Sequence, residues 1–176
     1  MRTRGRWYRA ALTVGVATVL VAGPAWASPH QVSRTAPAAA ALSNSDLEVV
    51  RLDPEPATPG GSTTIQGFVG NLGPETTASP FVVTVSLPHG VTPEKPYWPD
   101  TCVLSSSRRQ VHCEFSAGLK KDRSATALVP VRLDDELKVG TVVKGGWVSV
   151  RSLDDRNPLN NRAPFEITVV ETAPGH

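Results

Sequence analysis

The sequence is poor in the residues that metal, redox and hydrolase centres need. It has only two cysteines in 176 residues and no Cys-x-x-Cys pair, which argues against a zinc or dithiol centre. It has no Gly-x-Ser-x-Gly, the serine-hydrolase nucleophile motif. We therefore predict a protein that is not an enzyme and needs no cofactor. The histidines are too scattered to suggest a metal ligand set or a catalytic base, and they are His30, His89, His112 and His176.

Long apolar runs are also scarce, and the longest lies near the start of the chain. Four arginines within the first nine residues precede an apolar run over residues 10–22, which is too short to span a membrane. Ala25-Trp26-Ala27 follows as a small-x-small cleavage motif. Residues 1–27 thus predict a secretory signal peptide cut before Ser28, with an uncleaved anchor helix as the alternative. We expect the mature protein to be secreted and extracellular.

A basic surface is missing from the predicted mature chain. The full sequence has 18 Lys and Arg against 16 Asp and Glu, but four arginines belong to the signal peptide. The mature chain then has 14 basic and 16 acidic residues, a net charge of −2. Nucleic-acid binding requires a basic face that displaces counterions, so we do not expect a nucleic-acid partner.

The two cysteines predict one disulfide. In an exported chain a single pair of cysteines is most simply joined, here Cys102 to Cys113. The intervening residues are enough for two short strands and a turn at residues 105–107. The bond would therefore close a β-hairpin.

Apolar residues recur at every second position through most of the chain from residue 46 to 172. In residues 71–91, the side chains of Phe81, Val83, Val85 and Leu87 share one face of an extended segment between two turns. Seven or eight such strands, without an amphipathic helix, predict two packed antiparallel sheets, with a small barrel as the alternative. Residues 28–45 are expected to be a flexible leader, and 173–176 a short tail.

Prolines and alternation give more detailed expectations for three segments. The three prolines in residues 92–100 exclude a central strand there. Pro130 must lie where the ladder needs no N–H donor, near an edge or a bulge. In the strand after residue 141, one face is expected to hold Val142, Gly146, Val148 and Val150, and the opposite face Val143 and Trp147.

Five motifs occur in a fixed order, and together they resemble the bacterial immunoglobulin-like repeat called domain of unknown function eleven. They are Asn71-x-Gly73-Pro74, Leu87-Pro88-x-Gly90-Val91, the two cysteines, the Gly-Thr-Val-Val of residues 140–143, and Asp155-x-Asn157-Pro158-x-Asn160-Asn161. The resemblance spans residues 46–171. It implies an immunoglobulin-like β-sandwich with a structural or binding role at the cell surface and no catalytic motif. We expect a single monomeric module, in which Gly73 supplies a positive φ at its turn.

The polar segment 154–161 has two interpretations. Its carboxylates and amides could supply oxygen ligands to Ca²⁺, or they could satisfy the backbone of the turn itself. The spacing is not that of a dedicated calcium loop, and the self-bonded turn is the simpler interpretation. The candidate ligands are Asp154, Asp155, Asn157, Asn160 and Asn161.

Three aromatic residues are candidate contacts for a partner. Tyr97, Trp98 and Trp147 could stack on cell-wall carbohydrate or anchor a protein if they are exposed. Trp147 could instead pack under the proline-rich segment. A second hypothesis is a small extracellular enzyme or a protease-inhibitor-like protein, in which case residues 93–99 or the hairpin tip at 105–109 would be the protruding loop.

Overall fold

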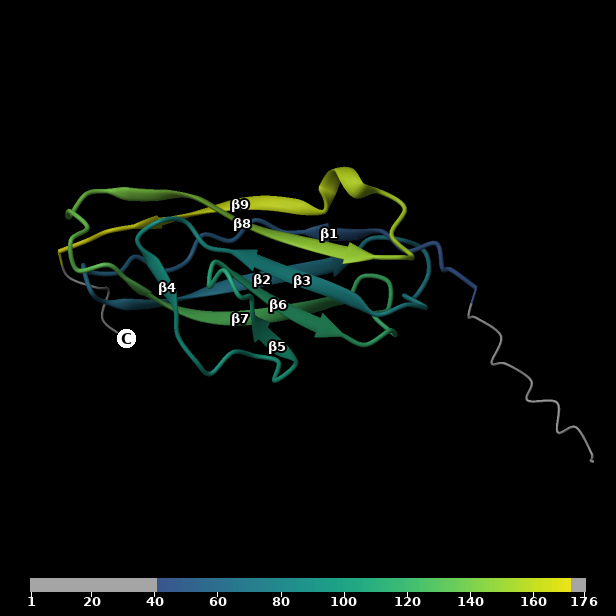
Figure 1. The fold of residues 1–176 in the computed structure, drawn as a ribbon. Helices are drawn as coiled ribbons and strands as arrows, with labels where there is room; N and C mark the ends of the chain where they lie inside the picture. Colours follow the sequence, from purple (N-terminus) through teal and green to yellow (C-terminus); the bar gives the residue numbers. More distant parts are fainter. Residues whose placement is uncertain (1–40, 172–176) are drawn as a thin grey trace, which may run out of the picture. The chain divides into compact units, whose positions relative to one another are not determined.

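The computed structural model describes residues 41–171, which form two antiparallel β-sheets packed face to face (Figure 1). The predicted signal peptide, most of the leader and the tail lie outside the described residues. A short 3₁₀ helix, η1 (Pro158–Asn160), is the one helical element in the described range. One sheet has the order β1 (Leu47–Val49), β2 (Ser62–Asn71), β7 (Ser124–Leu133) and β4 (Val91–Pro93). The other has the order β5 (Cys102–Leu104), β6 (Gln110–Phe115), β3 (Phe81–Ser86), β8 (Val142–Ser152) and β9 (Arg162–Thr168).

The strand order is that of an immunoglobulin-like sandwich. Strands β1, β2, β7 and β4 take the places of A, B, E and D, and β3, β8 and β9 take those of C, F and G. Strands β6 and β5 extend the second sheet beside β3, as C′ and C″ do in variable domains. The difference is that β4 precedes β5 and β6 in the chain. The all-β, immunoglobulin-like prediction is confirmed.

Period-two alternation builds the core. In β3 and just after it, Phe81, Val83, Val85 and Leu87 all point inward and are at most 5% exposed, as predicted. Ile65 and Val69 on β2 face them from the other sheet, together with alternate residues of β7. Each strand therefore buries one apolar face against the opposite sheet, which is the main stabilising contribution in such a fold.

A bulge in β8 overturns part of the predicted register. Val143 is buried and Val142 is 39% exposed, the reverse of the expected arrangement. The pairing with β9 shifts between Val143 and Gly146, where Gly145 adopts φ 93°. An extra residue in one strand moves every preceding side chain to the other face. Trp147 and Val148 follow the bulge and keep the faces that alternation predicts.

Pro130 lies within a strand that has neighbours on both sides, yet its position needs no donor. Strand β7 runs between β2 and β4, and β4 ends at Pro93. Beyond that end, the N–H of Glu94 donates to the carbonyl of Pro130 over 2.9 Å. The side of Pro130 that lacks an N–H therefore faces the end of a short edge strand, as predicted.

The cysteine hairpin forms as predicted. Cys102 and Cys113 lie opposite each other on β5 and β6, and their sulfur atoms are bonded. Both are buried, so the bridge fastens a three-residue edge strand to the sheet and to the core.

The start of the domain differs from the predicted boundary at residue 46. Ser43 and Ser45, assigned above to the leader, are 7% and 0% exposed. The N–H of Ser43 donates to Asp154, and the carbonyl of Ser45 accepts from Arg156. The sandwich therefore includes these residues. Within residues 41–171 no helix has the length and apolarity needed to cross a membrane.

Candidate functional site

A hollow of about 440 Å³ opens at one end of the outer face of the five-stranded sheet, and we call it the Trp147 hollow. It forms where β3 ends, β6 begins and β8 bulges. Its accessible surface is mostly apolar, and Arg109 and Lys144 bring positive charge to it. The lining residues are Ser86, Leu87, Pro88, His89, Ser107, Arg109, Gln110, Lys144, Gly145 and Trp147.

Strand register aligns three of these side chains in a row across the sheet. Ser86 pairs with Gln110 on one side and with Trp147 on the other. The side-chain amide of Gln110 donates to the hydroxyl of Ser86 over 3.1 Å. An amide, a hydroxyl and an indole therefore lie side by side, and directly opposed residues in a sheet are close enough to share one ligand.

Arg162 holds the indole of Trp147 in place. Its guanidinium carbon lies 4.0 Å from the ring centroid, a cation–π contact from the neighbouring strand β9. Arg162 does not line the hollow, although Trp147 does. The arginine therefore covers one face of the indole, and Trp147 still contributes to the lining of the hollow. A fixed aromatic side chain costs a ligand less entropy to engage than a mobile one.

Arg109 is fixed at the wall of the hollow by a backbone carbonyl. Its Nη2 donates to the carbonyl of Leu87 over 2.9 Å, and its own carbonyl accepts from the N–H of Leu87 over 2.8 Å. A guanidinium has five N–H donors, so one such bond leaves most of them free. No carboxylate of the described chain forms an ion pair with Arg109.

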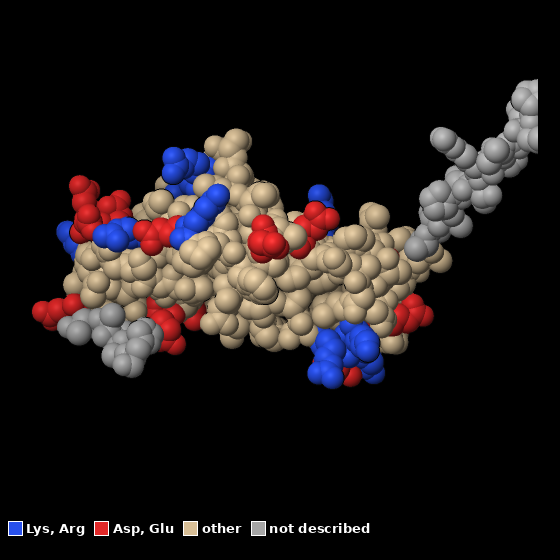
Figure 2. Space-filling view, turned by 90° about the horizontal axis from the view of Figure 1, so that it is seen from below, with Lys and Arg blue, Asp and Glu red and all other residues tan. Residues whose placement is uncertain are grey.

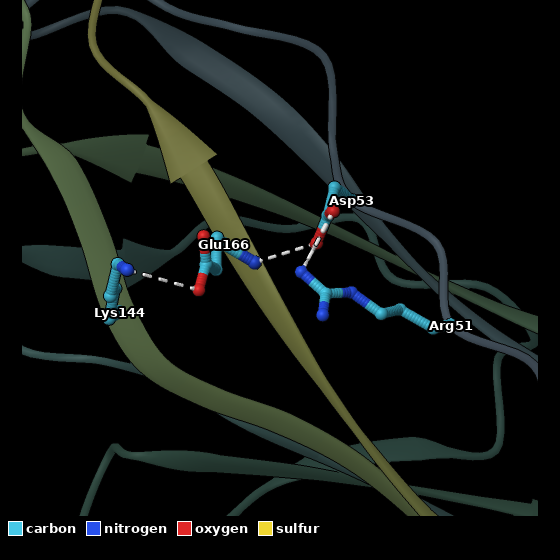
Figure 3. A network of polar contacts seen from close by, with 4 residues as sticks. All are labelled: Arg51, Asp53, Lys144 and Glu166. Carbon is cyan, nitrogen blue, oxygen red and sulfur yellow. Dashed lines mark hydrogen bonds and ion pairs between the residues drawn. The ribbon is translucent and has the colours of Figure 1, made fainter.

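Lys144 stands on the bulge of β8 and carries the second cation of the hollow. Its Nζ lies 3.5 Å from Glu166 on β9, whose backbone N–H donates to Asp53, and Asp53 pairs with Arg51 (Figure 3). The Lys144 side chain remains 68% exposed. Exposed ion pairs contribute only about 0–1 kcal/mol, so this contact does not prevent Lys144 from turning toward a ligand.

The proline-rich segment places its two aromatics away from the hollow. Tyr97 packs against the core, and burial raises the pKa of its phenol despite the opposing charge of Arg108. The backbone of Trp98 forms two hydrogen bonds with Leu128 of β7, while its side chain is 63% exposed. The three predicted aromatics therefore do not form one patch, and only Trp147 lines the hollow.

In the polar segment after β8, the carboxylates accept hydrogen bonds from neighbouring segments. Asp154 is fully buried and accepts from the N–H of Ser43, the N–H of Ser79 and the hydroxyl of Ser79, over 2.5–3.3 Å. Burial by itself would raise the pKa of Asp154, but these hydrogen bonds outweigh it and lower the pKa below its ordinary value. The carboxylate therefore joins the start of the domain to the segment before β3.

Asp155 serves the same purpose one residue later. It accepts from the backbone of Leu47 and Asn157 and from the side chain of Asn161, while Asn160 donates to Asp46. The side-chain oxygens of Asn160 and Asn161 are buried without a protein partner. Residues 41–171 contain no group of three His, Cys, Asp or Glu placed to hold a metal ion. Asp155 thus bonds within the turn to Asn157 and Asn161, while the bonds to Leu47 and Asp46 join the turn to the start of the domain.

Two other surface features fit a ligand less well. A groove of about 540 Å³ on the outer face of the four-stranded sheet is lined by prolines, hydroxyls and the carboxylates of Asp53 and Glu55, without an aromatic side chain. Lys and Arg occur only in small separate groups beside acidic residues on the face shown in Figure 2. Neither feature combines stacking with fixed polar groups, as the Trp147 hollow does.

Sequence reasoning found Trp147 but not the residues around it. Arg109 lay within the predicted hairpin tip, residues 105–109, and Lys144, Ser86 and Gln110 carried no motif. They meet because β3 pairs with both β6 and β8. Strand pairing of this kind is not encoded in any local pattern.

Comparison with known proteins assigns no family to this chain. No family model matches the chain, and no curated protein matches its sequence. Its fold is similar to the major pilin subunit BcpA of Bacillus cereus, at 9% identity over 73% of this chain and 40% of the pilin, with a TM-score of 0.49. It is also similar to a chain of the CaDoc0917–CaCohA2 complex, at 11% identity over 70% and 99% of the two chains, with a TM-score of 0.45. A third similarity, to AvmM, which catalyses macrocyclization in alchivemycin A biosynthesis, has 11% identity and a TM-score of 0.34 over 74% and 92%. Likenesses this distant bear on neither the activity nor the partners of this chain.

Proposed function

We propose that this protein is a non-catalytic, exported immunoglobulin-like module that binds cell-wall carbohydrate through the Trp147 hollow. The observation that carries the proposal is the row of Gln110, Ser86 and Trp147 across one sheet face. Aromatic rings stack on the apolar faces of sugars, and amides and hydroxyls bond their hydroxyl groups. The hollow is open and about 440 Å³ in volume, within the range of small-molecule sites.

The surroundings of the hollow favour binding over catalysis. Two of its polar side chains are already fixed by partners, with Gln110 bonded to Ser86 and Arg109 bonded to a backbone carbonyl. A nucleophile or general base instead needs an activating neighbour within hydrogen-bond reach. Fixed side chains of this kind orient a ligand without reacting with it.

Export is part of the same proposal. Its support is the predicted signal peptide together with the disulfide between Cys102 and Cys113, because such bonds persist in oxidising compartments outside the cytoplasm. Membership of the repeat family named above and a monomeric state also remain proposals. Together they describe a single domain released to contact the envelope.

The test is retention of the mature domain on purified bacterial cell-wall material, measured by co-sedimentation. The wild-type domain should be retained, and Trp147→Ala should reduce retention about tenfold, because loss of one stacking platform costs on the order of 1 kcal/mol or more. Trp98→Ala is the matched control, since it removes an exposed tryptophan that does not line the hollow.

Retention of Trp147→Ala equal to that of the wild type would contradict the proposal. Retention lost in Trp98→Ala alone would move the binding site to the proline-rich segment. Both variants should keep the thermal midpoint of the wild type within a few degrees, which separates lost binding from lost folding.

A further inference from the structure

We infer that the ligand of the Trp147 hollow is an acidic sugar, a unit whose ring carries a carboxylate. This inference rests on the function proposed above and names the chemical class of its ligand. It starts from the charges of the lining. Arg109 and Lys144 line the hollow, and Asp and Glu are absent from its lining.

The guanidinium of Arg109 is the main reason to expect an anion. Arg109 is half-buried, its guanidinium donates to the carbonyl of Leu87, and no carboxylate within residues 41–171 forms an ion pair with it. Removing a charge from water is costly unless a partner of opposite sign compensates it. A ligand carboxylate could take the remaining N–H donors of Arg109, and charge-assisted bonds to a guanidinium are among the strong ones.

Lys144 adds a mobile charge on the opposite wall. Its partner Glu166 does not line the hollow, and the pair is exposed at 68% and 36%. An incoming carboxylate would compete with Glu166 for the ammonium at little energetic cost. Arg162 contributes positive potential from behind the indole, 4.0 Å from its centroid.

A sugar ring is required as well as the charge. Trp147 offers a stacking surface, and the Ser86–Gln110 pair keeps a hydroxyl donor and an amide acceptor for ligand hydroxyls. In a hexuronic acid the carboxylate is attached directly to the ring. One unit can therefore stack on the indole and place its charge at the wall of the hollow. A flexible phosphate polymer without sugar rings would meet only the cations.

The experiment compares three probes for binding to the mature domain by calorimetry. They are polygalacturonic acid, the same polymer fully methyl-esterified, and inorganic polyphosphate. The acid polymer should bind about tenfold more tightly than its ester, a difference of about 1.4 kcal/mol, because a hydrogen bond to a charged group is stronger than one to a neutral group. Raising NaCl from about 50 mM to about 500 mM should remove most of this preference by screening.

Lys144→Glu should remove most of the acid preference, while Lys121→Glu, the same charge change on an exposed turn outside the lining, should preserve it. Trp147→Ala should weaken the binding of both sugar polymers. Equal affinity for acid and ester, with Trp147 still needed, would overturn this inference and leave the proposed function standing. Polyphosphate binding as tightly as the acid polymer would also overturn it. Wall material bound independently of Trp147 would overturn the proposed function itself.

Discussion

The side chain of Asn71 joins three separate segments of the chain. Its amide donates to the carbonyls of Glu75 and Leu119 over 2.8 and 2.9 Å, and its oxygen accepts from the N–H groups of Gly73 and Asp46 over 3.0 and 3.2 Å. Asn71 is fully buried. One buried amide therefore satisfies four backbone groups from these segments.

Asn71→Ala is expected to lower the free energy of unfolding by about 3 kcal/mol, because it leaves those four backbone groups without partners. Urea denaturation measures the change. Asn157→Ala is the control, since Asn157 uses its backbone N–H rather than its side chain to bond Asp155, and it should cost less than about 0.5 kcal/mol. A loss below about 1 kcal/mol for Asn71→Ala would show that water or backbone movement replaces the amide.

For Gly73, the turn motif pointed to a position that requires glycine, but it gave the wrong reason for the requirement. The sequence predicted a positive φ, but φ at Gly73 lies outside the left-handed range. A Cβ at this position would lie 2.4 Å from the backbone nitrogen of Asp46. Glycine is required because another segment passes against it, and such a contact between residues distant in sequence is invisible to a local turn pattern.

The lowered pKa of Asp154 makes stability depend on pH. A carboxyl whose pKa is lower in the folded than in the unfolded state stabilises the fold above its unfolded value of about 4, and this stabilisation is lost as pH falls through the folded value. Ser79→Ala removes a hydroxyl that donates to the charged carboxylate. It should destabilise the protein at pH 7, and this difference from the wild type should shrink as pH falls below about 4.

Urea unfolding at neutral and low pH measures this effect, with Ser152→Ala as the control. The hydroxyl of Ser152 bonds the carbonyl of Pro80 and the N–H of Asp154 but not its carboxylate. Its variant should therefore lose a similar amount at every pH. A Ser79→Ala deficit of constant size across the range would show that the hydroxyl does not stabilise the charged form.

At the scale of the element, alternation predicted β3 correctly and β8 only in part. Strand β3 is regular, so one face holds Phe81, Val83 and Val85 throughout. In β8 the Lys144-Gly145 pair forms the bulge, and the residues before it change faces. The same bulge lifts Lys144 to the rim of the Trp147 hollow. The bulge that made the predicted faces of the preceding residues wrong is thus part of the candidate site.

Gly146→Ala should test how closely the ring of Phe165 on β9 packs against β8 beside the bulge. A Cβ on Gly146 would lie 2.3 Å from the ring of Phe165, which is 1% exposed. Overpacking of this kind costs about 1–3 kcal/mol, so the thermal midpoint should fall by several degrees. Gly70→Ala on β2 meets nothing within 4 Å and should change stability by less than about 0.5 kcal/mol. Equal midpoints for both variants would mean that Phe165 can move aside.

At the scale of the whole molecule, the sequence predicted the class of fold but not which strands pair with each other. Turn residues and alternation predicted a sandwich because each strand needs a partner for its apolar face. They did not predict that β4 would join β7 or that β6 would join β3, since these contacts are set by the packing of the complete domain. The Trp147 hollow, built from β3, β6 and β8, was unpredictable for the same reason.

The start of the folded domain gives the last prediction. A chain beginning at residue 41 keeps Ser43, Ser45 and Asp46, which supply acceptors to the N–H groups of Ala78, Arg156 and Leu72 over 2.8–3.3 Å. A chain beginning at residue 47 loses all three, together with the N–H of Ser43 that donates to buried Asp154. We expect the shorter chain to be less stable by about 2–4 kcal/mol in urea denaturation, because buried backbone groups without partners cost about 1 kcal/mol or more each. Ser43→Ala in the full-length chain removes the hydroxyl that accepts from Ala78 and that also bonds the carboxylate of Asp154. It should cost about 1 kcal/mol, which keeps the test decisive if the shorter chain does not fold. Equal stability of the two chains would show that residues 41–46 do not stabilise the domain.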